Sequence, residues 1–287
     1  MLNRIIKFCS DKYEVSDNIC SYCKNTCHGS CKRCLEKINF KKEVIREYNC
    51  KNIVCYYTCH HLYRYASEIE YALEKFDHSV LKNLNILSIG CGPSTELYGI
   101  VNYFLTHGHR NITYHGIDQN RIWNKIQEKN KEIFEEVYKN ININYINTDA
   151  FDYINTIDIK PNVLILNYFI SDMLLHGNNM YSFVDKVYMN LITEMPENSI
   201  LILNDINLGK DDTHPRFYFE LLRDRLKSDN FTKTCARFHF KNNNRPFFNY
   251  GFLHTNNCIK YKVMPGIENL FEPWEFCASA QLLVRLK

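Results

Sequence analysis

The sequence predicts an α/β fold with a doubly wound, mostly parallel sheet, preceded by a small cysteine-rich segment that a metal would staple. From about residue 84 onward, short and nearly all-apolar runs alternate with helical patterns. Such runs suit strands that are buried on both faces, and right-handed crossovers through the helices make the sheet doubly wound. We predict a bound metal because nine of the thirteen cysteines lie before residue 60. Such clustering is typical of metal binding where thiols stay reduced.

Each element follows from a local pattern. Leu62, Tyr65, Ile69 and Leu73 recur at steps of three and four residues and predict a helix over 60–80. The apolar runs expected to form strands are 85–90, 112–118, 143–149, 162–167 and 199–205. The helical patterns between them cover 94–106, 121–138 and 182–195. The last two strand-like runs, 258–264 and 279–287, have no long helix between them, so we expect them to pair antiparallel at the sheet edge.

These patterns divide the 287 residues into three parts. We expect a cysteine-rich metal-binding segment at 1–60, a connecting helix at 61–83 and the α/β domain at 84–287. No apolar run approaches the ~18–20 residues that span a bilayer. The N-terminal apolar stretch is too short for a secretory signal. We therefore expect a cytoplasmic protein with no membrane partner.

The charge is distributed unevenly along the chain. Residues 1–64 hold twelve Lys or Arg against six Asp or Glu, which gives +6 in a chain whose net charge is +3. A basic head beside a mildly acidic body suits a phosphate-rich partner such as RNA or DNA. A solvated basic surface explains the same count.

A ligand site is predicted where three strands end. Gly90-Cys91-Gly92-Pro93 follows the first strand, where glycines let the backbone turn sharply and approach a ligand. Asp118 ends the second strand, where such folds place an acid that accepts hydrogen bonds from ribose hydroxyls. Asp149 ends the third strand. These features meet at one sheet edge, so we expect a shared nucleotide-type ligand, although turn glycines and helix-capping acids are the plain alternative.

The stretches around these residues resemble the motifs of class I S-adenosylmethionine-dependent methyltransferases, over roughly residues 84–287. LSIGCGPSTEL resembles the first motif, which implies that the Gly90–Pro93 loop, with Cys91 and Gly92, wraps the methionine moiety of the donor. HGIDQN resembles the second motif, which implies that Asp118 holds the ribose with Gln119 beside it.

Two further stretches complete the resemblance. INTDAFDY is similar to the third motif, which implies that Asp149 and Ala150 contact adenine. NVLILNYF is similar to the fourth, which implies that Asn167 and Tyr168 border the transferred methyl group. The terminal hairpin also matches the seven-stranded sheet of that family.

The resemblance has departures. Ser88 stands where the family carries an acid two residues before the first glycine, and Ser94 replaces a third glycine. Asn167 is followed by Tyr168 and Phe169, so the N-P-P-[YF] motif of amino-group DNA and some RNA methyltransferases is absent. NAD is the main rival ligand. The missing second catalytic α/β domain and the terminal hairpin favour the methyl donor.

The donor's sulfonium carries its own reactivity, so the protein mainly positions the acceptor and handles a proton. The candidates for acceptor contact are Asn167, Tyr168, Asp172 and Asp205, each of which could equally be a loop or capping residue. Tyr63 and Tyr65 are candidates for covering the donor pocket, or else for packing on a helix.

Three functions fit these features. The first is a methyltransferase whose basic head recruits RNA or DNA. The second is a methyltransferase, or an aminocarboxypropyl transferase, of a small molecule or a protein, with the head as lid or staple. The third is an inactive donor-binding scaffold.

The cysteines of the head have the spacing of metal ligands. Two Cys-x2-Cys knuckles are separated by seven residues, which suits tetrahedral zinc and resembles a zinc finger. The candidate ligands are Cys20, Cys23, Cys27, Cys31, Cys34, Cys50, Cys55 and Cys59. An iron–sulfur cluster is the alternative. The Cys-x3-Cys-x2-Cys spacing of radical S-adenosylmethionine enzymes also occurs, but no barrel pattern follows it, so we interpret the match as coincidental.

Overall fold

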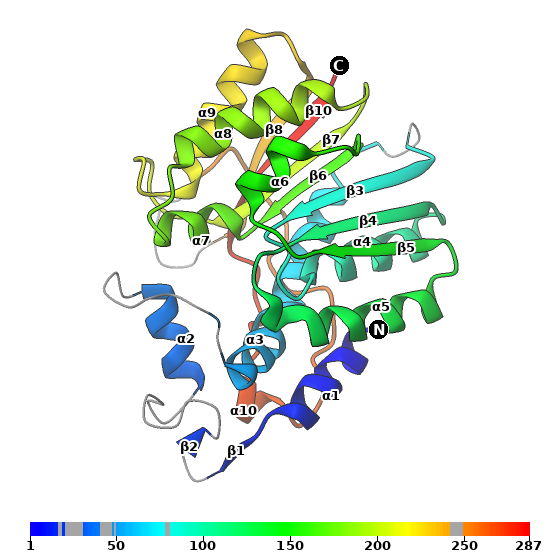
Figure 1. Ribbon diagram of the computed structural model, residues 1–287, viewed down its shortest axis with the longest axis vertical. Coiled ribbons are helices and arrows are strands. Elements are labelled where there is room, and N and C mark those ends of the chain that lie inside the picture. Colours follow the sequence, from blue (N-terminus) through cyan, green and yellow to red (C-terminus); the bar gives the residue numbers. More distant parts are fainter. Residues whose placement is uncertain (17–18, 21–30, 41–47, 49, 78–80, 242–248) are drawn as a thin grey trace.

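A computed structural model describes residues 1–16, 19–20, 31–40, 48, 50–77, 81–241 and 249–287 (Figure 1). The described helices are α1 Leu2–Lys12, α2 Cys31–Phe40, α3 Lys51–Leu73, α4 Thr95–Thr106, α5 Asn124–Val137, α6 Ala150–Thr156, α7 Phe169–Leu175, α8 Met180–Asn190, α9 Pro215–Ser228 and α10 Glu268–Phe271. The described strands are β1 Val15–Ser16, β2 Ile19–Cys20, β3 Asn83–Ile89, β4 Asn111–Ile117, β5 Ile141–Ile146, β6 Val163–Asn167, β7 Ile200–Ile206, β8 Thr232–His239, β9 Phe252–Leu253 and β10 Ser279–Leu286.

The main sheet has the order β5-β4-β3-β6-β7-β10-β8-β9. Strands β3 to β7 pair in parallel, whereas β10 pairs antiparallel with both β7 and β8. The chain enters at β3, steps outward to β5, and then crosses back to β6 on the other side of β3. Such a reversal of strand order opens a crevice at the carboxyl ends of the strands, where folds of this kind bind ligands. The predicted doubly wound α/β fold is confirmed.

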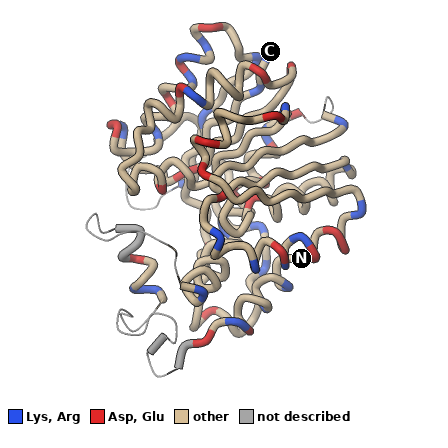
Figure 2. Tube along the Cα trace, viewed as in Figure 1, with Lys and Arg blue, Asp and Glu red and all other residues tan. Residues whose placement is uncertain are grey.

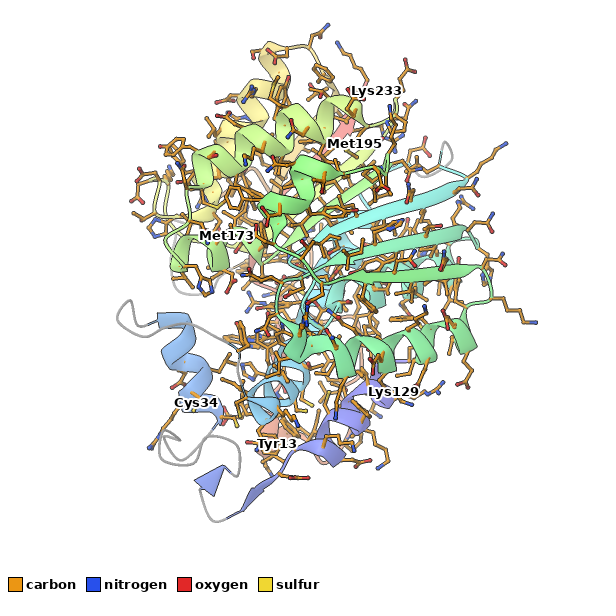
Figure 3. All side chains as sticks on the ribbon, viewed as in Figure 1. Tyr13, Cys34, Lys129, Met173, Met195 and Lys233 are labelled. Carbon is orange, nitrogen blue, oxygen red and sulfur yellow. The ribbon has the colours of Figure 1, made fainter. Side chains whose placement is uncertain are left out.

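Two helical layers cover the sheet because side chains of a buried strand alternate between its faces. On β3, Leu84 and Ile86 join the core formed with α1, α3, α4 and α5. Leu87 and Ile89 join the core formed with α6 to α9 on the opposite face, as Figure 1 shows. Met173 and Met195, labelled in Figure 3, belong to that second core. Apolar side chains on both faces explain why the strands read as nearly continuous apolar runs.

The antiparallel edge of the sheet differs from the prediction in two ways. The sheet has eight strands rather than seven, and the partner of β10 is β8 rather than the run 258–264. That run makes only an isolated bridge, between Cys258 and Phe276. Its backbone bonds instead to α3: the Lys260 N–H donates to Ser67 Oγ at 2.8 Å, and the Met264 N–H to the Tyr63 hydroxyl oxygen at 3.0 Å. All but one of the side chains of β8 are partly buried or exposed, so its apolar signal is weak.

Helix α3 lies against the sheet with almost every residue buried. It approaches α4 so closely that a Cβ on Gly99 would stand 2.3 Å from the Ala66 carbonyl oxygen. The expected boundary at residue 60 falls inside this helix. Helix α1 packs on α3, and both contribute to the same core as β3 and β4.

The described charges are mixed in sign. Figure 2 shows Lys and Arg interspersed with Asp and Glu along α1, α5 and α9. None of the described helices combines the length and the apolar character that crossing a membrane requires.

Candidate functional site

The loop after β3 is built from left-handed backbone. Gly90, Gly92 and Ser94 have φ angles of 68°, 48° and 54°. At Gly90 a Cβ would lie 2.1 Å from Cδ2 of Phe169, so only glycine fits there. The N–H groups of Gly90 and Cys91 donate to the Ile117 carbonyl oxygen at 2.8 and 3.0 Å, which ties the loop to the end of β4.

Asp118 stands next to this loop, directly after β4. Its carboxylate accepts hydrogen bonds from the N–H groups of Gly92 and Asn120, both at 2.8 Å. Burial raises its pKa to about 6, and the nearby acids Asp172 and Glu96 push in the same direction. The two amide donors fix the orientation of the carboxylate at the edge of the sheet.

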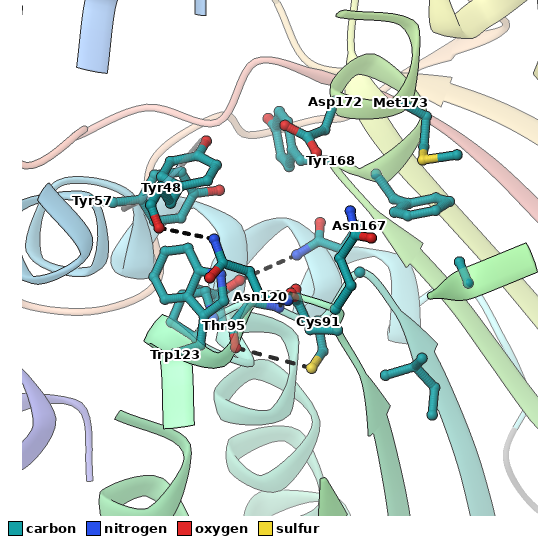
Figure 4. A pocket seen from close by; sticks show the side chains of 18 of the residues that line it. Tyr48, Tyr57, Cys91, Thr95, Asn120, Trp123, Asn167, Tyr168, Asp172 and Met173 are labelled. Carbon is teal, nitrogen blue, oxygen red and sulfur yellow. Dashed lines mark hydrogen bonds between the residues drawn. The ribbon is translucent and has the colours of Figure 1, made fainter. Parts of the chain in front are cut away.

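The predicted residues surround one cavity of about 480 Å³ at the carboxyl ends of β3, β4, β5 and β6 (Figure 4). All of the predicted donor-site residues line it, namely Gly90, Cys91, Gly92, Pro93, Asp118, Gln119, Asp149, Ala150 and Asn167. Of the predicted acceptor-site residues, Tyr168 and Asp172 line it as well. The topology thus brings together side chains from four strand ends.

Asp205 is not among the residues that line this cavity. Its neighbour Asn204 points to the α3 side of β7, so alternation directs Asp205 toward α7. There its carboxylate is buried and accepts from the N–H groups of Ser171 at 3.0 Å and Ile206 at 2.7 Å. Burial raises its pKa to about 6. Asp205 therefore serves as a hydrogen-bond acceptor for a free backbone N–H in the first turn of α7.

Asp149 both lines the cavity and caps a helix, the two roles that the sequence left as alternatives. It lines the cavity, and it also caps α6 by accepting from the N–H groups of Phe151 at 2.8 Å and Asp152 at 3.2 Å. The cap fixes the end of β5 against the cavity wall.

Glu96 is a buried acid in the cavity lining that sequence reasoning missed. Its Oε1 accepts from Ser88 Oγ at 2.6 Å and from the Tyr114 hydroxyl at 2.5 Å. Burial raises its pKa. Because Ser88 holds the position where the resembled family has an acid, Glu96 brings a carboxyl to the same place from the first turn of α4. The contact between the two residues depends on folding, so spacing could not reveal it.

An aromatic wall closes the cavity on the side of α3. Tyr48 and Tyr57 approach Trp123 with ring centroids 5.4 and 5.5 Å away. Asn120 holds Tyr48 in place by donating to its carbonyl oxygen at 2.9 Å, a contact drawn in Figure 4. Of the two tyrosines expected to cover the pocket, Tyr65 lines it, whereas Tyr63 lies fully buried in the core.

Tyr168 is held by a buried polar network from α3. Its φ of 55° is unusual for a bulky residue, and the surroundings must compensate for the strain. The Tyr168 hydroxyl donates to Glu68 at 2.9 Å and accepts from Arg64 at 2.7 Å. Its ring stacks on Tyr65 at a centroid distance of 3.8 Å. Asn204 links the network to the cavity by donating to Glu68 at 3.0 Å and to Asn167 at 2.8 Å.

The predicted metal ligands do not converge in the part of the chain that the structure describes. No group of three His, Cys, Asp or Glu side chains there could hold a metal ion. Cys55 and Cys59 lie in the core between α3 and α1, where the Cys59 thiol donates to the Ile6 carbonyl oxygen at 3.8 Å. Hydrogen bonding with Cys9, together with burial, raises the pKa of the Cys55 thiol. Side chains of Cys20, Cys23 and Cys27 lie outside the described residues.

Comparison with known proteins gives a match in shape only. No protein-family profile matches the chain, and no curated protein matches its sequence. Similar solved structures include a candidate class I S-adenosylmethionine-dependent methyltransferase from Listeria monocytogenes, with 11% identity and a TM-score of 0.43 over 77% of this chain and 58% of that one. TrmN from Thermus thermophilus has 8% identity and a TM-score of 0.43, over 78% of this chain and 52% of TrmN.

Fibrillarin from Aeropyrum pernix, solved with natively bound S-adenosylmethionine, has 12% identity and a TM-score of 0.38. The match covers 78% of this chain and 76% of fibrillarin. The chain thus spans just over half the length of the Listeria and Thermus proteins. TM-scores and sequence identities this low do not support a functional argument. Any proposal about function therefore rests on the cavity at the ends of β3 to β6.

Proposed function

We propose that the chain is an S-adenosylmethionine-dependent methyltransferase that binds its donor in the cavity at the ends of β3 to β6. The observation that carries the proposal is convergence. The left-handed loop after β3, Asp118 after β4, Asp149 and Ala150 after β5, and Asn167 after β6 all line one cavity.

Each group has a physical role in the proposed complex. The Gly90–Pro93 loop brings backbone close to the methionine moiety without a Cβ in the way. Asp118 accepts hydrogen bonds from the ribose hydroxyls, and Asp149 with Ala150 borders the adenine. Glu96 supplies the negative charge opposite the methionine ammonium, which replaces the acid missing at position 88. Trp123 and its tyrosine neighbours cover the donor.

The sulfonium of the donor supplies the reactive methyl group. The protein then has to orient the acceptor in line with the methyl and exclude water. Tyr168 and Asn167, fixed by the buried network around Glu68, border the place where transfer would occur. Asp172 lines the same cavity and is the acid that we propose handles a proton, since Asp205 bonds to the backbone of α7 and does not line the cavity.

Zinc in the N-terminal segment and recruitment of RNA or DNA stay as secondary proposals. The side chains of the candidate zinc ligands Cys20, Cys23 and Cys27 lie outside the described residues, as do five basic side chains of the head, those of Lys24, Lys37, Lys41, Lys42 and Arg46. Within the described part, Lys32 of that head pairs with Glu272 at 2.5 Å, so one lysine of the head already has an acidic partner. Metal content of the purified protein decides the zinc proposal.

Replacing Asp118 by Asn tests the donor site. The substitution keeps the shape but removes the charge that accepts the ribose hydroxyls, so donor affinity should fall by about ten-fold or more, from a loss of ~1.5–3 kcal/mol. Calorimetric titration with S-adenosylmethionine and S-adenosylhomocysteine measures this. The control is Asp158→Asn, an exposed acid remote from the cavity lining, which should bind as wild type. A wild-type protein that binds neither compound, or binds NAD in preference, would sink the proposal.

A further inference from the structure

A second cavity, of about 560 Å³, lies between α2, α3 and the segment 272–276. Its lining includes Lys32 and Glu36 from α2, Tyr56, His60 and His61 from α3, and Trp274. The donor proposal uses none of these residues.

Unpartnered polar atoms gather in the wall of this cavity. The Tyr56 hydroxyl and both ring nitrogens of His61 are buried and have no hydrogen-bond partner among the residues that the structure describes. The two residues are 2% and 6% exposed, so water at the surface does not solvate them. Buried polar groups in native proteins nearly always have a partner, and leaving one without a partner destabilises the fold. All three atoms belong to residues that line this cavity, so a polar molecule bound there would supply their partners.

The shape of the lining suits a flat ring. Tyr56 stacks on His60 with centroids 5.5 Å apart and planes 21° apart, and His60 meets Trp274 edge-on at 5.5 Å. Trp274 and Phe276 are 43% and 54% exposed at the rim, which is unusual for rings of this size. Aromatic walls around a few convergent polar groups are typical of small-molecule sites.

Charge at the rim disfavours an anion. The described ionised residues in the lining are one lysine against three glutamates, Glu36, Glu272 and Glu275. The lysine, Lys32, already pairs with Glu272. Burial lowers the pKa of His61 well below its usual value, so its ring is neutral and offers one donor and one acceptor. A phosphate would meet repulsion here, whereas a neutral or cationic ring would not.

A single aromatic column separates the two cavities. His61 stacks on Tyr65 with planes 5° apart and centroids 4.9 Å apart, and Tyr65 stacks on Tyr168. Both tyrosines line the donor cavity, so only this column separates a ligand beside His61 from the proposed donor site. Arg64 bridges the same wall: its guanidinium lies 4.9 Å from the Trp274 ring centroid and donates to the Tyr168 hydroxyl at 2.7 Å.

We propose that the second cavity binds a planar aromatic small molecule, neutral or cationic, whose polar substituent bonds to Tyr56 and His61. This site does not rest on the proposed methyltransferase function, because it follows from the unpartnered atoms, the aromatic lining and the charge. The aromatic column between the cavities keeps a molecule bound there out of contact with the proposed donor.

The two tryptophans of the chain permit a direct test, because Trp123 lines the donor cavity and Trp274 the second. In a Trp123→Phe variant, fluorescence reports the second cavity alone. The probes are p-cresol, tyramine and 4-hydroxyphenylacetate, which share one phenol ring and differ in charge. We expect saturable changes in Trp274 emission with p-cresol and tyramine, and at least ten-fold weaker binding of 4-hydroxyphenylacetate. No saturable response to any probe, or preference for the anion or for a single-stranded RNA oligonucleotide, would overturn the proposal.

Matched substitutions separate ligand binding from packing. Tyr56→Phe removes a hydroxyl that has no partner in the free protein, so thermal stability should hold or rise while tyramine affinity falls by about ten-fold. His61→Phe keeps the aromatic column and should weaken tyramine to a similar degree. The control is His107→Phe, since His107 also stacks on a tyrosine, Tyr103 at 4.1 Å, but lines neither cavity. Wild-type tyramine affinity in both cavity variants would contradict the assignment.

Calorimetric titration with S-adenosylmethionine, run on the Trp274→Phe variant, keeps the two proposals distinguishable. Donor binding without a Trp274 response in the Trp123→Phe variant would remove the second site alone. A Trp274 response without donor binding would remove the methyltransferase function and leave a site for aromatic molecules.

Discussion

Asp118 holds a carboxylate in surroundings that favour its protonated form. Because burial raises its pKa from 3.8 to about 6, the free folded protein binds this proton more tightly than the unfolded chain. The contribution to stability is therefore complete below pH 3.8 and is lost as the pH rises through about 6. Ribose hydroxyls that donate to the carboxylate would favour the opposite, ionised form.

Donor affinity should consequently depend on pH. We expect affinity for S-adenosylhomocysteine to be constant above about pH 7 and to fall as the pH drops below about 6, since protonation removes the acceptor charge. Titrations across this range measure the profile. Asp118→Asn should flatten the step, which separates Asp118 from Glu96 and Asp172, the two acids that face it. A step that persists unchanged in the variant would assign the titration to another group.

Glu96 permits a second test at the scale of single residues. Glu96→Gln keeps acceptor oxygen for Ser88 and Tyr114 but removes the charge proposed to face the methionine ammonium. Affinity for S-adenosylhomocysteine should fall by about ten-fold, in line with ~1.5 kcal/mol for a hydrogen bond to a charged group. Methylthioadenosine lacks the ammonium, so its affinity should not change. Equal losses for the two compounds would mean that Glu96 supports the loop rather than the ligand.

At the scale of elements, the contact between α3 and α4 sets the position of the network that holds Tyr168. Gly99 is the point of closest approach, and its neighbour across the contact is the Ala66 backbone, which cannot rotate away as a side chain can. Helix α3 also carries Glu68 and Arg64, so a shift of this helix would move the groups that fix Tyr168.

Gly99→Ala should therefore destabilise the protein, although the same change at an open helix position normally stabilises by ~0.5–1 kcal/mol. The added methyl must push α3 and α4 apart, which costs ~1–3 kcal/mol for overpacking. Urea unfolding followed by circular dichroism measures the free energy of unfolding. Stabilisation by the substitution would show that the two helices can separate at no cost.

At the scale of the whole molecule, the local sequence pattern predicted the parallel strands because they are buried on both faces and therefore appear as apolar runs. Their ends were also clear, since glycines follow the first of these strands and aspartates follow the next two. The residues that line the cavity at the ends of β3 to β6 could be picked out from the same strand ends. Residues that reach the cavity from elsewhere could not be predicted, since Tyr57 and Glu96 depend on how helices dock. Asp205 was placed at the right strand end but on the opposite face, because one residue along a strand reverses the direction of a side chain.

The antiparallel edge and the N-terminal part show a second limit of pattern. Residues 258–264 alternate like a strand, yet the N–H groups of Lys260 and Met264 donate to Ser67 and Tyr63 of α3. The cysteine count similarly predicted a separate metal-held unit. In the described structure Cys9, Cys55 and Cys59 are instead buried between α1 and α3, in one core with the sheet. Cysteine serves both as a small apolar core residue and as a metal ligand, and composition alone does not distinguish the two roles.

This shared core predicts that residues 1–60 are needed for folding of the rest. A fragment 61–287 would begin inside α3 and would lose α1, whose Ile5 and Ile6 are fully buried. Each such side chain contributes ~1.5–3 kcal/mol through burial, and domains have only ~5–15 kcal/mol of net stability. We expect the fragment to show no cooperative thermal transition. Point substitutions give the matched control: Ile6→Ala should cost ~2–5 kcal/mol, whereas Lys7→Ala, exposed on the same helix, should change stability little. A fragment that melts as cooperatively as the full chain, with Ile6→Ala as mild as Lys7→Ala, would instead establish the N-terminal part as an independent appendage.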